Sequence, residues 1–294
     1  MNRKGVEFTG TAQVRDARII GNKLYLYTVP YTAPVRTVGG PILEMYISSP
    51  QPNIIRTEAI HFSGGNQKYP EFDLNIADFT PEFNLTEAYV SIKSGDTELV
   101  ITRRPCTFTY YYKGKKIAGI TEKDNQSMIC TVSTQDDDLM DRQLDLELIG
   151  SSKNASRFNS FMCVQMQIDM GEKIYGLGER FTPFVKNGQS VTTWNEDGGT
   201  NTDISYKCVP FYVTNRGYGV FVNDTGPVSY EICSEHTESV QFSVPGEKID
   251  FMVIGGDTMK DVISGYTTLT GKPALPPAWS FGLWLTTSST MQYV

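Results

Sequence analysis

The stretch SVQFSVPGEKIDFMVIGG, residues 239–256, decides the fold predicted for this chain. Its two ends are rich in Val, Phe, Ile and Met, and a Pro-Gly pair stands between them. β-Branched and aromatic residues favour strands, whereas Pro-Gly favours a turn. The stretch therefore predicts a strand, a turn and a second strand.

Similar segments recur toward the N-terminus. KLYLYTVP (residues 23–30) and YGVFVND (218–224) are strand-like and bounded by Gly, Asn, Asp or Pro. TFTYYYKGKKIAGIT (107–121) predicts a hairpin with Gly114 in its turn. In FMCVQMQI (161–168) polar and apolar residues alternate with the period of a half-buried strand. Many short strands separated by turns predict a mainly β chain folded as an antiparallel β-sandwich.

The pattern changes after residue 256. In DTMKDVISGYTTLTG, residues 257–271, apolar residues recur at helical spacing, with Asp257 placed to cap the helix and Gly271 to end it. A packed apolar face explains this spacing better than a stripe that contacts a cofactor. The following KPALPPAW, residues 272–279, should run extended because it is rich in proline.

The last segment suggests a second domain. SFGLWLTTSS, residues 280–289, is compact and nearly all apolar, which fits a parallel-sheet strand covered on both faces. The chain stops soon afterwards at Val294, so it looks truncated where another domain begins. We therefore expect a sandwich over residues 1–256, a helix and connector over 257–278, and the start of a second domain over 279–294.

Composition excludes several classes of function. The chain has 294 residues and a formal net charge of −7, with no Lys/Arg block long enough to follow a phosphate backbone, which argues against nucleic acid. It shows neither a secretory signal nor an apolar run long enough to cross a membrane. Five widely spaced cysteines without a C-x-x-C pair indicate reduced, mostly buried thiols and a cytoplasmic protein.

No metal site is expected. A zinc site needs clustered Cys and His, and His61 and His236 have no ligand-like neighbours in the sequence. The densest acidic run, DDDLMDRQLDLE (136–147), lacks the spacing and turn glycine of an EF-hand loop. We interpret it as a solvated loop leading into a strand rather than a calcium site.

One loop combines features of a turn and of a ligand site. Between Phe181 and Thr202 the connection is longer than a tight hairpin, and such loops on rigid sheets often carry function. Its WNEDGGT segment (194–200) places an Asp-Gly turn signal beside aromatic, amide and carboxylate groups, the usual equipment for sugar binding. Composition alone leaves a plain turn and a ligand loop equally open.

Two motifs resemble a known family. YGLGERFTPFVKNGQSVTTWNEDGGT (175–200), continued by YKCVPFYVTNRGYGVFVN (206–223), and TGKPALPPAWSFGLWLTTS (270–288) are similar to the N-terminal portion of glycoside hydrolase family 31, specifically its bacterial α-xylosidases. The resemblance is close over residues 172–288 and weaker before them. It implies a galactose-mutarotase-like supersandwich followed by a (β/α)8 catalytic barrel whose first strand is WSFGLWLTT.

The resemblance also implies site residues. A sandwich loop reaches over the barrel mouth, and its DGG aspartate binds substrate, which places Asp197, Gly198 and Gly199 in a substrate-binding role. Where the α-xylosidases carry a phenylalanine that walls the sugar site, this chain has Ser289. A serine there would enlarge or wet the pocket, which leaves the choice between xylose and glucose open.

The family's chemistry follows from paired carboxylates. It retains anomeric configuration through an aspartate nucleophile and an aspartate acid/base roughly 5 Å apart. Both lie beyond the equivalent of Val294, so we expect no catalytic residue here and no turnover by the chain alone. We expect Glu179 to anchor the loop or form an ion pair. No cofactor is expected.

The partners implied are an oligosaccharide or α-xyloside substrate and the remainder of the barrel. The resemblance allows a homo-oligomer, as in similar enzymes, without fixing the oligomeric state.

Two other classes of function remain possible. The chain could be a free-standing carbohydrate-binding module, with SFGLWLTT as an edge strand of the sandwich. A mutarotase-like isomerase would need a histidine and a carboxylate in one cleft, and two isolated histidines argue against it.

Overall fold

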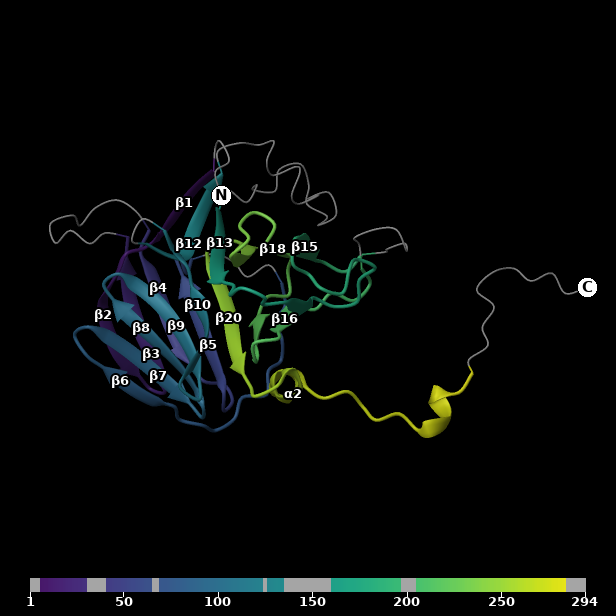
Figure 1. The fold of residues 1–294 in the computed structure, drawn as a ribbon. Coiled ribbons are helices and arrows are strands. Elements are labelled where there is room, and N and C mark those ends of the chain that lie inside the picture. Colours follow the sequence, from purple (N-terminus) through teal and green to yellow (C-terminus); the bar gives the residue numbers. More distant parts are fainter. Residues whose placement is uncertain are drawn as a thin grey trace, which may run out of the picture.

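The computed structural model describes residues 6–30, 41–64, 69–123, 126–134, 160–196 and 205–283. Within these ranges the chain forms two antiparallel β-sheets, stacked into a sandwich, with one α-helix and a C-terminal tail that leaves the body (Figure 1). The acidic run at 136–147 lies outside the described residues. The predicted antiparallel β-sandwich is confirmed.

The larger sheet has twelve described strands and is branched. Its main path runs β15 (Gln189–Thr193), β18 (Val228–Ile232), β19 (Ser239–Pro245), β13 (Ser160–Gln167), β10 (Lys115–Ile120), β9 (Cys106–Tyr112), β8 (Thr97–Arg103), β7 (Tyr89–Ser94) and β6 (Glu82–Leu85). Off this path, β12 (Gln126–Thr134) pairs with β13, β1 (Val6–Thr11) and β11 (Glu122–Lys123).

The smaller sheet has eight described strands. Its order is β14 (Ile174–Gly176), β16 (Phe211–Thr214), β17 (Tyr218–Val222), β20 (Lys248–Gly255), β5 (Ile54–Ile60), β4 (Leu43–Ser48), β3 (Lys23–Val29) and β2 (Gln13–Ile20). The β5–β20 pair joins distant parts of the chain. Arg56 Nη2 donates to Asp250 Oδ2 at 2.6 Å across it. Burial raises the pKa of Asp250, although Arg56 opposes that rise.

The core lies between the two sheets. The predicted strand–turn–strand at 239–256 is confirmed as β19 and β20, and these two strands belong to different sheets. Their Pro-Gly turn therefore carries the chain across the sandwich. Phe242 and Phe251, one from each strand, lie with their ring centroids 5.5 Å apart and belong to one buried apolar cluster.

The predicted hairpin at 107–121 is also confirmed. Tyr112 pairs with Lys115, and the two residues between them, Lys113 and Gly114, both have positive φ angles. This combination is the type I′ geometry that matches the twist of the flanking strands.

The expected half-buried character of β13 is wrong, because the strand is buried on both faces. Gln165 is only 7% exposed. Its Nε2 donates to Ser239 Oγ at 2.8 Å, and its Oε1 accepts from Thr121 Oγ1 at 3.0 Å. Neighbouring strands thus supply the hydrogen bonds that let a polar residue occupy a central, buried strand.

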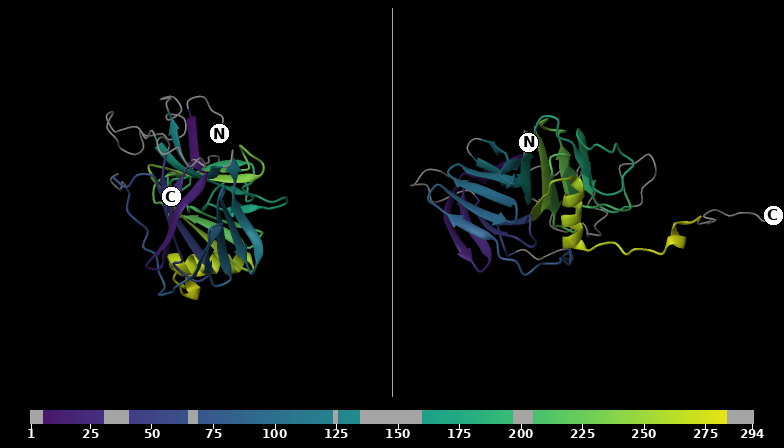
Figure 2. Two further views of the ribbon diagram at one scale, coloured as in Figure 1. Left: turned by 90° about the vertical axis from the view of Figure 1, so that its left-hand side faces the viewer. Right: turned by 60° about the horizontal axis from the view of Figure 1, so that its bottom comes forward.

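The predicted helix is α2 (Met259–Thr270). It ends at Gly271 as expected, but Thr258 caps it instead of Asp257: the Thr258 hydroxyl accepts from Asp261 N, and the Asp261 carboxylate accepts from Thr258 N. Val262 and Leu269 are buried, whereas Met259 and Ile263 are exposed. The helix packs on β16, β17 and β20 (Figure 2), with Tyr266 stacked on Phe211 at a centroid distance of 4.1 Å.

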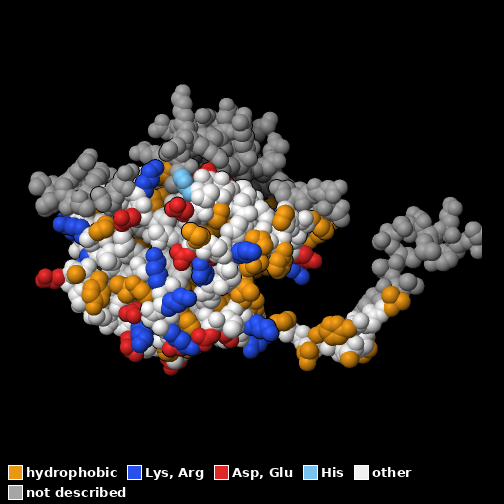
Figure 3. Space-filling view, viewed as in Figure 1, with side chains coloured by type: hydrophobic (Ala, Val, Ile, Leu, Met, Phe, Trp, Pro, Cys, Tyr) orange, Lys and Arg blue, Asp and Glu red, His pale blue; other side chains and the backbone are white. Residues whose placement is uncertain are grey.

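Beyond α2 the chain runs as an exposed connector into a short 3₁₀ turn, η2 (Ala278–Phe281). Its apolar side chains lie outside the body of the molecule (Figure 3). This turn stands where the sequence predicted the end of the extended connector (272–279) and the start of an apolar strand (280–289), because its local i→i+3 hydrogen bonds, Ser280 N to Pro277 O among them, replace an extended backbone. Residues 284–294 are outside the described ranges, so the rest of the barrel strand and the boundary at residue 279 remain predictions.

Two further observations concern the helices and the cysteines. No helix among the described residues is both long and apolar enough to span a membrane. All five cysteines are free; Cys106, Cys130 and Cys163 are buried, while Cys208 and Cys233 are half-buried.

Candidate functional site

The candidate site is the base of the loop that carries the DGG sequence. Residues 197–204 are outside the described ranges, so Asp197, Gly198 and Gly199 have no described position, and the same holds for Ser289. The chain on either side is described. We name residues 192–196 the ascending leg and residues 205–208 the descending leg.

The two legs are joined directly. Glu196 N donates to Ser205 O at 3.0 Å, beside a parallel bridge between Asn195 and Ser205. Cys208 N donates to Asn195 Oδ1 at 2.6 Å. Asn195, which the sequence suggested as a sugar-binding amide, therefore has a structural hydrogen bond within the loop base.

A third segment, the YGLGER motif, lies against the descending leg. Gly176, Leu177 and Gly178 all have positive φ angles. A Cβ on Gly178 would sit 2.2 Å from Lys207 O, so only glycine permits this approach. Gly178 thus brings the segment after β14 into backbone contact with the descending leg, whereas Gly176 lies against Phe211 O of β16.

Glu179 anchors the loop through its backbone. Its N–H donates to Lys207 O at 2.9 Å, and its carbonyl oxygen accepts from the Ser205 hydroxyl. The Glu179 side chain is exposed. Loop anchoring was one of the two roles expected for this residue.

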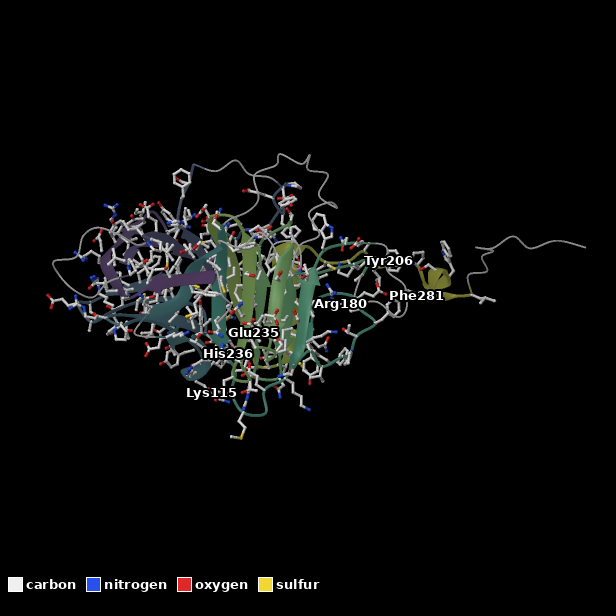
Figure 4. All side chains as sticks on the ribbon, turned by 90° about the horizontal axis from the view of Figure 1, so that it is seen from above. Lys115, Arg180, Tyr206, Glu235, His236 and Phe281 are labelled. Carbon is white, nitrogen blue, oxygen red and sulfur yellow. The ribbon has the colours of Figure 1, made fainter. Side chains whose placement is uncertain are left out.

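Arg180 is the residue that the sequence analysis missed. Its Nη2 donates to Thr192 O at 2.5 Å and to Cys208 Sγ at 3.1 Å, while Nε donates to Leu177 O at 3.3 Å. The guanidinium therefore contacts both legs and the motif strand. Figure 4 places Arg180 and Tyr206 at the same end of the sandwich, on the side where the C-terminal tail leaves. The only signal in the sequence was its position directly after YGLGE.

Trp194 is packed against a distant segment. Its ring meets Tyr69 edge-on at a centroid distance of 6.1 Å, and Tyr69 lies so close to Gly226 that a Cβ there would be 2.6 Å from its ring. Burial raises the pKa of Tyr69 and also that of nearby Asp224, whose Oδ1 accepts from Gly226 N at 2.7 Å. The contact between Trp194 and Tyr69 thus helps to hold the ascending leg in place.

A histidine–carboxylate pair does exist, contrary to the expectation of isolated histidines. His61 Nδ1 lies 2.6 Å from Glu247 Oε2, and Ser160 Oγ donates to Glu247 Oε1 at 2.6 Å. The pair is on the surface, with the two side chains 34% and 29% exposed. It ties the end of β5 to the β19–β20 turn and to the start of β13.

Metal chemistry gains no support from the described part of the chain. Within those ranges no group of three or more His, Cys, Asp or Glu side chains is placed to hold a metal ion.

Comparison with known proteins identifies the family to which this sandwich belongs. A match to the glycosyl hydrolase 31 N-terminal galactose mutarotase-like domain spans residues 44–231, and the chain belongs to this family of domains. It is 38% identical over 273 residues to an α-xylosidase of Emericella nidulans, covering 87% of this chain and 33% of that protein. It is 36% identical over 297 residues to the α-xylosidase XylQ of Lactiplantibacillus pentosus, covering 100% of this chain and 36% of that protein. The chain thus spans about a third of the length of these relatives.

Solved structures share the fold. The cycloalternan-forming enzyme from Listeria monocytogenes in complex with a pentasaccharide substrate superimposes with a TM-score of 0.73 at 19% identity, covering 95% of this chain and 24% of that one. A family 31 α-xylosidase from a soil metagenome, complexed with xylose, gives a TM-score of 0.60 at 16% identity, covering 89% of this chain and 35% of that one.

Proposed function

We propose that this chain is the sandwich portion of a retaining α-glycosidase that removes terminal α-linked xylose, or with less support glucose, from oligosaccharides. The observation that carries the proposal is the similarity to two α-xylosidases along nearly the whole chain. Its role is to supply a substrate-binding loop to a catalytic barrel.

The loop base supports this role physically. A carboxylate binds sugar hydroxyls well only if it is held where they arrive, because ordering it at the moment of binding costs free energy. The two legs are hydrogen-bonded to each other, and just beyond β14 Glu179 bonds the descending leg and Arg180 the ascending leg. Asp197, on the span between these legs, is proposed to accept hydrogen bonds from the sugar.

The catalytic aspartates are proposed to lie in the barrel, beyond residue 294, so the chain alone should not turn over substrate. We also propose that the protein is located in the cytoplasm and assembles into a homo-oligomer. The chemistry requires only carboxylates, and we propose no cofactor.

The test is a kinetic comparison of Asp197→Ala with the natural sequence, made in the longest reading frame that contains this chain. A charged hydrogen bond contributes roughly 1.5–3 kcal/mol, so KM for an aryl α-xyloside should rise about 10- to 150-fold. Comparing an aryl α-xyloside with the matching α-glucoside shows which sugar the site with Ser289 prefers. Unchanged kinetics would remove Asp197 from the binding site, and turnover by residues 1–294 alone would contradict the division of roles.

A further inference from the structure

Arg180 occupies a junction of three chain segments. Through Nε it holds Leu177 O in its own motif, and through Nη2 it holds Thr192 O on the ascending leg and Cys208 Sγ on the descending leg. The Cys208 thiol in turn donates to Trp194 O at 3.1 Å. A continuous set of contacts therefore runs from the guanidinium to the residue three positions before Asp197.

The guanidinium is chemically suited to this junction. It is planar, always charged and presents several donors in a fixed fork, so one side chain can bind several acceptors whose relative positions it then fixes. A lysine ammonium is a single point on a flexible stem. It keeps the charge but cannot hold the three acceptors in the same relation.

The junction meets the buried core through the backbone of Leu177, whose side chain belongs to the larger apolar cluster. Thr192 and Cys208 belong to neither of the two buried apolar clusters, and Arg180 is half-buried. The two legs also keep their own bond between Glu196 N and Ser205 O. Losing the hydrogen bonds of the guanidinium should therefore change the position of the joined legs relative to β14 and leave the fold intact.

We propose that Arg180 is a positioning residue: it fixes the ascending and descending legs relative to the end of β14, and thereby the affinity for the sugar. The kinetic part of this proposal rests on the proposed function of Asp197. The structural part does not depend on it.

The structural part is tested on residues 1–294 by labelling Cys208 with a thiol reagent, with peptide mass spectrometry to separate it from half-buried Cys233. Arg180→Lys retains the charge, so a change in labelling reports geometry rather than the loss of a cation. We expect Cys208 to react about tenfold faster, because its half-buried sulfur loses the guanidinium that contacts it at 3.1 Å and becomes more accessible to the reagent.

Arg216→Lys is the matched control, since Arg216 Nη2 also donates to a backbone oxygen, Met170 O, at 2.8 Å. It should leave Cys208 labelling unchanged. Unchanged labelling in Arg180→Lys overturns the proposal, as does an equal rise in Arg216→Lys.

The kinetic part is tested in the longest reading frame, with Asp197→Ala measured beside Arg180→Lys. Misplacing a binding group weakens substrate binding, so KM for an aryl α-xyloside should rise about tenfold with kcat little changed. A purely structural role would lower the active fraction and hence the apparent kcat at constant KM, which would overturn the proposal. If Arg180→Lys does not fold, Cys208→Ala takes its place in the kinetic test, because it removes the contact between Arg180 and the descending leg.

The positioning role of Arg180 and the proposed function of Asp197 are contradicted by different results. If Asp197→Ala raises KM and Arg180→Lys does not, the positioning role is wrong and the proposed function stands. If Asp197→Ala has no effect, the substrate-binding role of the loop is wrong, and the labelling result alone decides whether Arg180 holds the legs.

Discussion

Three consecutive residues, Gly176, Leu177 and Gly178, take positive φ angles where β14 ends. This conformation costs free energy for residues with a Cβ, and Leu177 nevertheless adopts it while fully buried. Gly178 carries a second constraint, because its backbone touches the descending leg. The motif therefore depends on backbone shape as much as on side-chain chemistry.

Replacing Gly178 with Ala separates these two constraints. Gly188 has nearly the same φ, +86° against +87°, but open space around its missing Cβ. Gly188→Ala should cost about 1 kcal/mol of unfolding free energy from the φ angle alone. Gly178→Ala should cost about 3 kcal/mol or more, because the new methyl meets Lys207 O and Val209 N. Urea denaturation measures both, and equal losses would mean that the backbone contact is not tight.

Among the elements, α2 shows how a local interaction chooses between neighbouring residues. Asp257 and Thr258 are both good capping residues. Thr258 forms a reciprocal capping box with Asp261, whereas Asp257 turns to Lys113 Nζ at 2.6 Å. The box satisfies two backbone N–H donors at once, those of Thr258 and Asp261, which a single cap does not.

The choice of cap can be tested by two alanine substitutions. Thr258→Ala should lower the unfolding free energy by about 1 kcal/mol, the usual contribution of an N-cap. Asp257→Ala should have little effect, because its ion pair with Lys113 is exposed and screened by solvent. Thermal or urea unfolding distinguishes the two variants. A larger loss at Asp257 would show that the cap has been misassigned.

The sequence predicted those elements whose cause is local. Gly114 and Gly271 mark a turn and a helix end through backbone freedom, and both appear where expected. The burial of Gln165 depends on partners from other strands, so alternation along β13 could not reveal it. The separation of β19 and β20 into two sheets is likewise a property of the assembled sandwich.

The candidate site divides in the same way. The YGLGER motif and the DGG loop could be recognised in the sequence. The role of Arg180 could not, because it depends on three acceptors that lie up to 28 positions away in the chain. Asp197 and Ser289 keep the roles inferred for them as predictions.

At the scale of the whole molecule, the segment after α2 exposes several large apolar side chains in succession. Leu275 is 94% exposed and Leu283 is 93% exposed. Exposed apolar surface of this kind promotes association.

Ending the chain at Gly271 should therefore raise its solubility. The unfolding free energy should stay within about 0.5 kcal/mol, because residues 272–277 are exposed throughout. Precipitation by polyethylene glycol compares the solubilities, and urea denaturation compares the stabilities. A shorter chain that is less soluble would indicate that the removed segment packs on the sandwich.

The pairing of β5 with β20 has a consequence for synthesis. Its members Arg56 and Asp250 are 194 positions apart, so a ribosome completes β3, β4 and β5 long before their neighbour exists. At 5–20 residues per second the wait is roughly 10 to 40 s. During it the nascent chain presents an open strand edge to its surroundings. The yield of folded protein should consequently depend on translation speed and on chaperones that shield that edge.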